Sequence, residues 1–145
     1  MTPEPATPLA EPFTFPVRVY YEDTDSGGVV YYANYLKFLE RARTEWLRAA
    51  GFEQPELMRD HNVTFVVRSV AIEYLQPARF NDALQVTLAL EKLGSCTLDV
   101  FQTVARDRRL VEARVQLVCV DNRDGFKPVR IPAVIRQQLE SISKA

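Results

Sequence analysis

The chain has 145 residues, of which 47% are hydrophobic and 26% charged, and its formal net charge is −1. This composition excludes a disordered or fibrous protein and predicts one globular domain that buries about 70% of its unfolded surface without disulfides or metal. The near-neutral charge argues against a protein that binds duplex DNA or RNA, because such a protein carries a basic surplus.

The first twelve residues, MTPEPATPLAEP, are rich in proline and lack an apolar run. We predict that residues 1–12 form a flexible tail and that residues 13–145 form a single domain. The tail does not resemble a secretion signal, and no run in the chain approaches the ~20 apolar residues that a membrane span needs. We therefore expect a cytoplasmic protein.

Alternating apolar residues predict a first strand from Phe13 to about Glu22. One face of this strand carries Phe13, Phe15, Val17, Val19 and Tyr21. The sequence DTDSGG, residues 23–28, then gathers turn-forming residues, which predicts that the strand ends there.

From Tyr35 onward, apolar residues recur every three or four positions, which is typical of an amphipathic helix of about 17 residues. Its apolar face consists of Tyr35, Phe38, Leu39, Ala42, Trp46 and Ala49. Gly51 is expected to end this helix, because glycine readily adopts the left-handed conformation that follows many helices. A shorter helix is expected from Pro55 to Asp60.

From Thr64 the apolar period returns to two, which predicts four further strands. They are defined by Val66, Val70, Ile72 and Tyr74; by Leu84, Val86, Leu88 and Leu90; by Leu98, Val100 and Val104; and by Val111, Ala113, Val115, Leu117 and Cys119. Short loops join them and favour antiparallel pairing. A last helix is expected from Pro132 to about Ile142. Because helices and strands are segregated, the predicted class is α+β, with one long helix on one face of an antiparallel sheet.

The segment from Tyr20 to Tyr35, YYEDTDSGGVVYYANY, combines a strand end, a glycine-containing turn and a helix start. The first turn of a helix has unpaired backbone N–H groups and a positive dipole end, which suit a developing oxyanion. A carboxylate beside it would act as base or nucleophile on a carbonyl held by those groups. Asp and Gly are also ordinary turn residues, so the pattern alone leaves a structural role open.

Other chemistries fit this segment less well. A calcium loop needs an oxygen ligand at its fifth position and a glutamate at its twelfth, where this chain has Gly27 and Asn34. Asp23 and Asp25 would suit magnesium, but the βαβ alternation that usually builds phosphoryl-transfer sites is missing. The pair Gly27-Gly28 matches neither a phosphate-binding loop nor a dinucleotide fingerprint.

Cys96 and Cys119 lie in strand-like runs and are expected to be buried free thiols, as suits a reducing compartment. A cysteine nucleophile would need a partner base, and the only histidine, His61, lies in a polar stretch. A zinc site is not expected from one histidine and two strand cysteines.

The run from Val17 to Arg48, VRVYYEDTDSGGVVYYANYLKFLERARTEWLR, closely resembles the Tol-Pal-associated acyl-CoA thioesterases, a branch of the 4-hydroxybenzoyl-CoA thioesterase family. The later runs FVVRSVAIEYLQPARFND and LVCVDNRDGFKPVRIP are similar to that branch, so the resemblance covers about residues 15–135. It implies the hotdog fold, an antiparallel sheet of five to six strands wrapped around one long central helix. It also implies a homodimer or homotetramer with active sites at the subunit interface.

The resemblance implies roles for particular residues. Asp25 matches the family's catalytic aspartate, and Tyr21 matches a tyrosine thought to support that site. Tyr32 departs from the Tol-Pal branch, which usually has histidine there, but agrees with the hydroxybenzoyl branch, where a backbone N–H at this point polarises the thioester carbonyl. Because tyrosine, with an ordinary pKa near 10, is a poor base but a usable donor, Asp25 must carry hydrolysis largely alone, as nucleophile or general base.

Gly28 and Val29, in the turn, and Arg68 are assigned to substrate binding. Arg68 belongs to a group of cations at expected strand ends or turns that would meet the phosphates of coenzyme A, although solvating the surface is the commoner role. The other cations of this group are Arg79, Arg123, Lys127 and Arg130.

The predicted function is hydrolysis of an acyl-CoA to a free acid and CoA, with no metal or redox cofactor. The alternative is a non-catalytic hotdog module that binds proteins of the envelope or of lipid synthesis, because Tyr32 replaces the usual histidine. Hydration or dehydration of an acyl thioester would need a histidine paired with a carboxylate, and His61 lies outside the helix start. The acyl group and an acyl carrier protein in place of CoA stay open.

Overall fold

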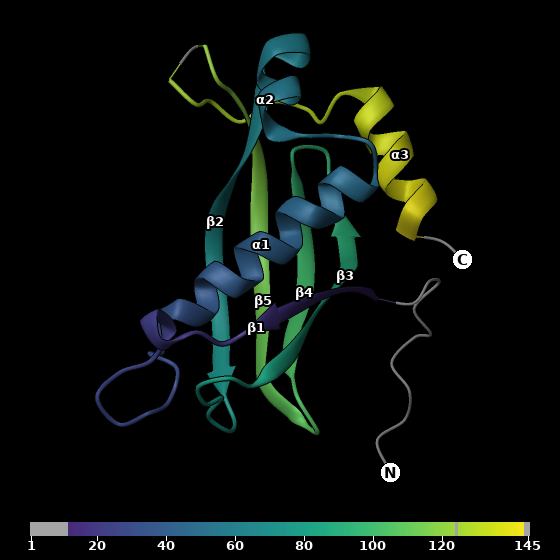
Figure 1. Ribbon diagram of the computed structural model, residues 1–145. Helices are drawn as coiled ribbons and strands as arrows, with labels where there is room; N and C mark the ends of the chain where they lie inside the picture. Colours follow the sequence, from purple (N-terminus) through teal and green to yellow (C-terminus); the bar gives the residue numbers. More distant parts are fainter. Residues whose placement is uncertain (1–11, 124, 144–145) are drawn as a thin grey trace.

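The computed structural model describes residues 12–123 and 125–143, so the predicted tail lies almost wholly outside the described residues. A five-stranded antiparallel sheet has the strand order β1-β3-β4-β5-β2 (Figure 1). Its strands are β1 (Phe13–Arg18), β2 (Val63–Tyr74), β3 (Ala83–Leu93), β4 (Thr97–Ala105) and β5 (Arg109–Asp121). The sheet therefore has β1 and β2 at its two edges.

Helix α1 (Asn34–Ala49) runs across one face of this sheet, close to the predicted bounds (Figure 1). Its buried residues are Tyr35, Phe38, Leu39, Ala42, Trp46 and Leu47. Ala49, expected on the apolar face, is exposed. Gly51 ends the helix as predicted: its φ is +97°, and the N–H groups of Gly51 and Phe52 donate to the last-turn carbonyls of Arg48 and Leu47, both at 2.9 Å.

The shorter predicted helices are also present. Helix α2 (Gln54–Glu56) continues into a π-helical turn (Leu57–His61), so His61 is the last residue of a helical turn. Helix α3 (Ala133–Ser143) follows Pro132 and lies near β3 (Figure 1). Among the described residues no helix is long and apolar enough to cross a membrane.

The core lies between α1 and the sheet. The central strands alternate as predicted, and their inward residues are buried: Leu84, Val86, Leu88, Leu98, Val100, Val104, Val111, Ala113, Val115, Leu117 and Cys119. Full burial of one large aliphatic side chain stabilises the fold by about 1.5–3 kcal/mol. Gln102 is the polar exception: its amide donates to the Leu39 carbonyl (3.0 Å) and accepts from Arg43 (3.1 Å), which satisfies the buried group and fixes α1 against β4.

Two predicted strands differ from the observed ones. The first strand ends at Arg18, because the Tyr20 N–H donates to the Asp23 carboxylate (2.8 Å) and residues 21–23 form a 3-10 turn. In β2 the predicted parity was wrong at the start, because a β-bulge between Val67 and Ser69 shifts the alternation, so that Phe65 is buried and Val66 exposed. With five strands around α1, the structure confirms the α+β class and the hotdog fold.

Candidate active site

The segment between β1 and α1 folds into a small hairpin. Thr24 and Val30 form an antiparallel bridge, the Asp25 N–H donates to the Val29 carbonyl (2.9 Å), and the Gly28 N–H donates to the Asp25 carbonyl (3.1 Å). Gly28 has a φ of +83°, the left-handed conformation that three-residue hairpin loops require and that glycine adopts without steric cost. The hairpin therefore presents the Asp25 side chain from a fixed turn.

Asp23 is buried and acts as a brace. Its carboxylate accepts from the Tyr20 N–H and from the Asn34 side-chain amide, both at 2.8 Å, and its carbonyl accepts from the Tyr31 N–H at 2.8 Å. These contacts tie the end of β1 to the start of α1. Because both of its carboxylate oxygens already accept a hydrogen bond, Asp23 is a structural residue of the site.

Asp25 is exposed and differently surrounded. One carboxylate oxygen accepts from the Gly27 N–H at 2.8 Å. No residue of the described part of the chain hydrogen-bonds the other oxygen. Asp25 therefore has one oxygen held by its own turn and the other open to react with a bound molecule.

The start of α1 offers open backbone donors. Within the described ranges, no acceptor is recorded for the N–H groups of Tyr32 and Ala33, and Ala33 at the N-cap provides no capping side chain. Unpaired N–H groups at a helix start, together with the positive end of the helix dipole, stabilise a developing negative charge. This helix start therefore suits the carbonyl oxygen of a thioester.

An open cleft of about 230 Å³ adjoins the helix start. Its lining residues are Val30, Tyr32, Tyr35, Tyr74, Gln76 and Pro77. The cleft touches both the hairpin, through Val30, and the N-terminal turn of α1. An acyl group bound in it would lie beside the open N–H groups.

Two tyrosine hydroxyls of this cleft, those of Tyr35 and Tyr74, form hydrogen bonds with backbone groups. The Tyr74 hydroxyl donates to the Tyr32 carbonyl (3.2 Å), and the Tyr35 hydroxyl oxygen accepts from the Ala78 N–H (2.9 Å). Burial raises the pKa of both Tyr35 and Tyr74 above the ordinary tyrosine value. Both phenols therefore stay protonated near neutral pH, so that Tyr74 remains a donor.

The predicted site residues are only partly brought together. Gly28 and Val29 form the hairpin with Asp25, and Tyr32 lines the cleft, where its ring meets Tyr74 edge-on with centroids 6.2 Å apart. Tyr21 is instead exposed and stacks on Phe80 at a centroid distance of 3.9 Å. Within the described residues Tyr21 makes no recorded contact with Asp25.

Arg68 was expected at a strand end, but it lies inside β2 at the bulge, on the exposed edge of the sheet. Arg123, Lys127 and Arg130 follow β5 at the end of the sheet where Val63 pairs with Asp121, whereas the cleft lies by Tyr74 at the other end of β2. Arg79 is the cation of the group that lies by the hairpin, where it forms a bridge with Val29.

Neither cysteine belongs to this site. Cys119 is buried, and burial raises the pKa of its thiol to about 11, which keeps it protonated and unreactive; Cys96 is only partly buried. Within residues 12–123 and 125–143, no three His, Cys, Asp or Glu side chains form a group that could hold a metal ion.

The sequence reasoning missed the residues that Tyr74 and the following loop contribute. In the sequence, Tyr35 and Tyr74 fit the apolar periodicity of a helix and of a strand, which hid their hydroxyl contacts. Residues 75–82 connect β2 to β3 and carry no sequence motif, yet Gln76 and Pro77 line the cleft and the Ala78 N–H donates to the Tyr35 hydroxyl. The available signal in the sequence was Pro77 and the polar residues Arg79, Asn81 and Asp82 that follow it.

Known proteins resemble this chain over most of its length. A family model described as the Thioesterase-like superfamily matches residues 19–139. The acyl-CoA thioesterase YbgC of Haemophilus influenzae is 43% identical over 125 residues, covering 86% of this chain and 91% of the relative. The acyl-CoA thioester hydrolase YbgC of Escherichia coli O6:H1 is 46% identical over 125 residues, covering 85% and 92%.

A solved structure has the same fold as this chain. The probable thioesterase from Bartonella henselae superposes with a TM-score of 0.80 at 33% identity, covering 84% of this chain and 100% of that chain.

Proposed function

We propose that this chain, which belongs to the thioesterase-like superfamily, hydrolyses the thioester bond of an acyl-CoA to a free acid and CoA. Relatives that are 43% and 46% identical to it over 125 residues are named acyl-CoA thioesterase and acyl-CoA thioester hydrolase. The observation that carries the proposal is the arrangement of the hairpin: it carries Asp25, one of whose carboxylate oxygens has no hydrogen bond from a described residue, and it leads directly into a helix start with open N–H groups and an adjoining cleft.

In the proposed mechanism the thioester carbonyl oxygen accepts hydrogen bonds from the N–H groups at the start of α1. The main donor among them is the Tyr32 N–H. The charge that develops on this oxygen is stabilised there by the N–H groups and the helix dipole. The acyl group occupies the cleft beside Val30 and Tyr74. In this mechanism the phenol of Tyr32 donates a hydrogen bond to the bound substrate and does not act as the base.

Asp25 acts by one of two routes. As a nucleophile, its carboxylate attacks the carbonyl carbon, CoA leaves as a thiolate, and water then hydrolyses the mixed anhydride. As a general base, it takes a proton from water, the hydroxide attacks the carbonyl carbon, and the proton passes to the leaving sulfur. Both routes need an Asp25 oxygen that accepts no hydrogen bond from the protein. This supports Asp25 over Asp23, because both Asp23 oxygens accept hydrogen bonds.

The assembly is proposed to be a homodimer or homotetramer. Strand β2 is a 12-residue edge strand that exposes Val66, Val67 and Val70, and such an edge favours pairing with another strand. Membership of the Tol-Pal branch, a cytoplasmic location and an acyl carrier protein as the carrier of the acyl group all stay predictions.

The test is release of CoA by the purified chain from acetyl-, butyryl-, benzoyl- and palmitoyl-CoA, with the free acid measured in the same samples. The cleft of about 230 Å³ is smaller than the ~300 Å³ or more of drug-sized sites, so we expect the short and single-ring acyl groups to react fastest. A protein-only sample corrects for the thiols of Cys96 and Cys119. No CoA release from any of the four would reject hydrolysis and favour the non-catalytic module.

A further inference from the structure

The loop of residues 75–82 lies directly beside the hairpin that carries Asp25. The Val30 N–H donates to the Ala78 carbonyl at 2.9 Å, and Val29 forms an antiparallel bridge with Arg79. Val29 in turn accepts the hydrogen bond of the Asp25 N–H. The loop thus acts as a third strand-like segment, and its position sets the position of the hairpin.

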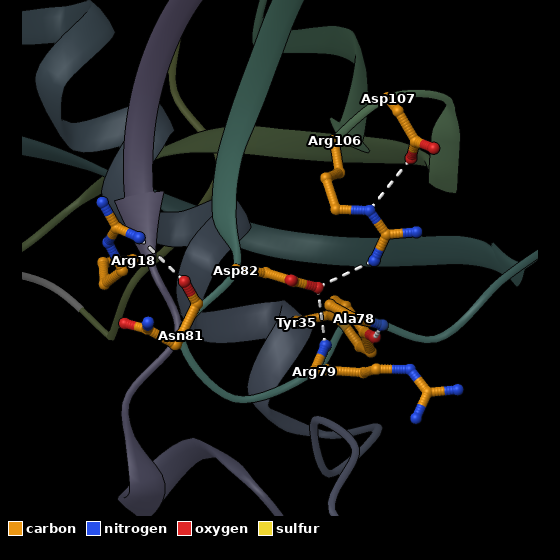
Figure 2. Close-up of polar contacts among 8 residues, drawn as sticks. All are labelled: Arg18, Tyr35, Ala78, Arg79, Asn81, Asp82, Arg106 and Asp107. Carbon is orange, nitrogen blue, oxygen red and sulfur yellow. Dashed lines mark hydrogen bonds and ion pairs between the residues drawn. The ribbon is translucent and has the colours of Figure 1, made fainter.

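Asp82 holds the far side of this loop. One oxygen of its carboxylate accepts both from the Arg79 N–H and from the Arg106 guanidinium, each at 2.8 Å, and Arg106 also pairs with Asp107 at 2.9 Å (Figure 2). The Arg79 side chain extends away from Asp82, so Asp82 holds the backbone of Arg79 and not its charge (Figure 2). The ion pair thus joins the loop to the turn after β4.

The same end of the loop is fixed to the end of β1 by two hydrogen bonds between backbone groups and one from the Arg18 side chain. The Val19 N–H donates to the Asp82 carbonyl (3.0 Å), the Asn81 N–H donates to the Val19 carbonyl (2.9 Å), and Arg18 donates to the Asn81 carbonyl (2.8 Å). The backbone of Asp82 is therefore held independently of its side chain. Removing the carboxylate would free the Arg79 N–H, while the hydrogen bond from the Asp82 N–H to the Arg79 carbonyl (3.1 Å) and the end of the loop stay in place.

We propose that Asp82 and Arg106 are positioning residues for the proposed hydrolysis: through Arg79 and Val29 they fix the backbone that carries Asp25. The inference rests on the proposed function for its effect on turnover. Neither residue lines the cleft, so neither touches the substrate's acyl group. The chain of contacts is continuous from the Asp82 carboxylate to the Arg79 N–H, the Val29 bridge and the Asp25 N–H.

The energetics separate this role from a merely structural one. The side chains of Arg106 and Asp82 are 32% and 20% exposed, and partly exposed ion pairs contribute little to global stability. A small displacement of a catalytic group can nevertheless cost up to about 100-fold in rate. The ion pair should therefore affect turnover more than unfolding.

The first test compares kcat and KM of Asp82→Ala with those of Asp107→Ala, which removes the other carboxylate on the same arginine. Alanine is used because an asparagine side chain would still accept from the Arg79 N–H. We expect kcat of Asp82→Ala to fall about 10- to 100-fold with KM within about threefold, and Asp107→Ala to match the wild type. Arg106→Lys should keep kcat within about threefold, whereas Arg106→Gln should lower kcat in the same direction as Asp82→Ala. The double variant Asp82→Ala/Arg106→Gln should lose no more than about twofold beyond Asp82→Ala.

The second test needs no turnover. Hydrogen–deuterium exchange of the amides in residues 24–30 should be about tenfold faster in Asp82→Ala than in Asp107→Ala, with exchange in α1 unchanged. Unchanged exchange, or a kcat of Asp82→Ala equal to that of Asp107→Ala, would overturn the proposal. If the wild type hydrolyses no acyl-CoA and Asp82→Ala still exchanges faster than Asp107→Ala, the proposed function is rejected and the positioning role is kept.

Discussion

Asp23 and Asp25 are separated by one residue, yet their carboxylates meet different surroundings. The Asp23 carboxylate is buried, and each of its oxygens accepts one hydrogen bond, which ties the end of β1 to the start of α1. The Asp25 carboxylate is exposed and bonded at one oxygen. A carboxylate can attack a substrate or take a proton only if the reacting molecule can reach it, so the proposed chemistry is assigned to the exposed Asp25 and not to the buried Asp23.

The Tyr74 hydroxyl can be tested with a single-residue variant. The variant Tyr74→Phe removes the hydroxyl that donates to the Tyr32 carbonyl while keeping the ring, and one such hydrogen bond contributes about 0.5–1.5 kcal/mol. We therefore expect kcat to fall by about 2- to 10-fold, measured by CoA release.

Tyr31→Phe is the matched control for this variant, since the Tyr31 hydroxyl has no hydrogen bond recorded in the described part of the chain. It should retain wild-type kcat. Equal losses in the two variants would contradict a specific role of the Tyr74 hydroxyl.

Two segments depend on a left-handed glycine: the hairpin that carries Asp25, and the end of α1. Gly28 and Gly51 have φ values of +83° and +97°, and a Cβ added at either meets no atom within 4 Å. Replacement by alanine therefore costs backbone strain and no clash, about 1–2 kcal/mol for each residue.

We expect Gly28→Ala and Gly51→Ala to lower the free energy of unfolding by similar amounts, about 1–2 kcal/mol, as measured by urea denaturation. Only Gly28→Ala should lower kcat, because only this glycine shapes the hairpin that presents Asp25. Equal kcat values for the two variants would argue against the hairpin as the catalytic element.

The regular elements were predictable because their signals are local. Helix α1 and the central strands follow from apolar periods of 3.6 and 2, and Gly51 marks the helix end. The bulge in β2 and the 3-10 turn after β1 were not, because they depend on the strand partner and on the carboxylate of Asp23. The cleft was missed for the same reason: Tyr74 and Pro77 reach Tyr32 only after β2 has paired.

At the scale of the whole molecule, the two sheet edges differ. Strand β1 has six residues, including Pro16, which cannot donate to a neighbouring strand. Strand β2 has 12 residues and exposes Val66, Val67 and Val70. A long apolar edge of this kind pairs readily with another strand, so β2 is the edge at which we expect a second copy of the chain.

Light scattering after size-exclusion chromatography tests this expectation. The wild type should elute as a dimer or tetramer, and Val67→Lys should shift it to a smaller species, because a charge on the edge strand opposes pairing. Thr14→Lys, on the exposed side of β1, should leave the mass unchanged. A wild-type monomer, or no change in Val67→Lys, would contradict pairing through β2.

The central claim is that the Asp25 carboxylate carries the hydrolysis of the thioester. The most direct measurement is kcat for CoA release by Asp25→Asn, set against Glu22→Gln, which makes the same change at an exposed carboxylate three positions earlier. We expect Asp25→Asn to lose at least about a thousandfold in kcat with its fold intact, and Glu22→Gln to keep the wild-type rate. An Asp25→Asn variant that stays within about tenfold of the wild type would contradict the claim.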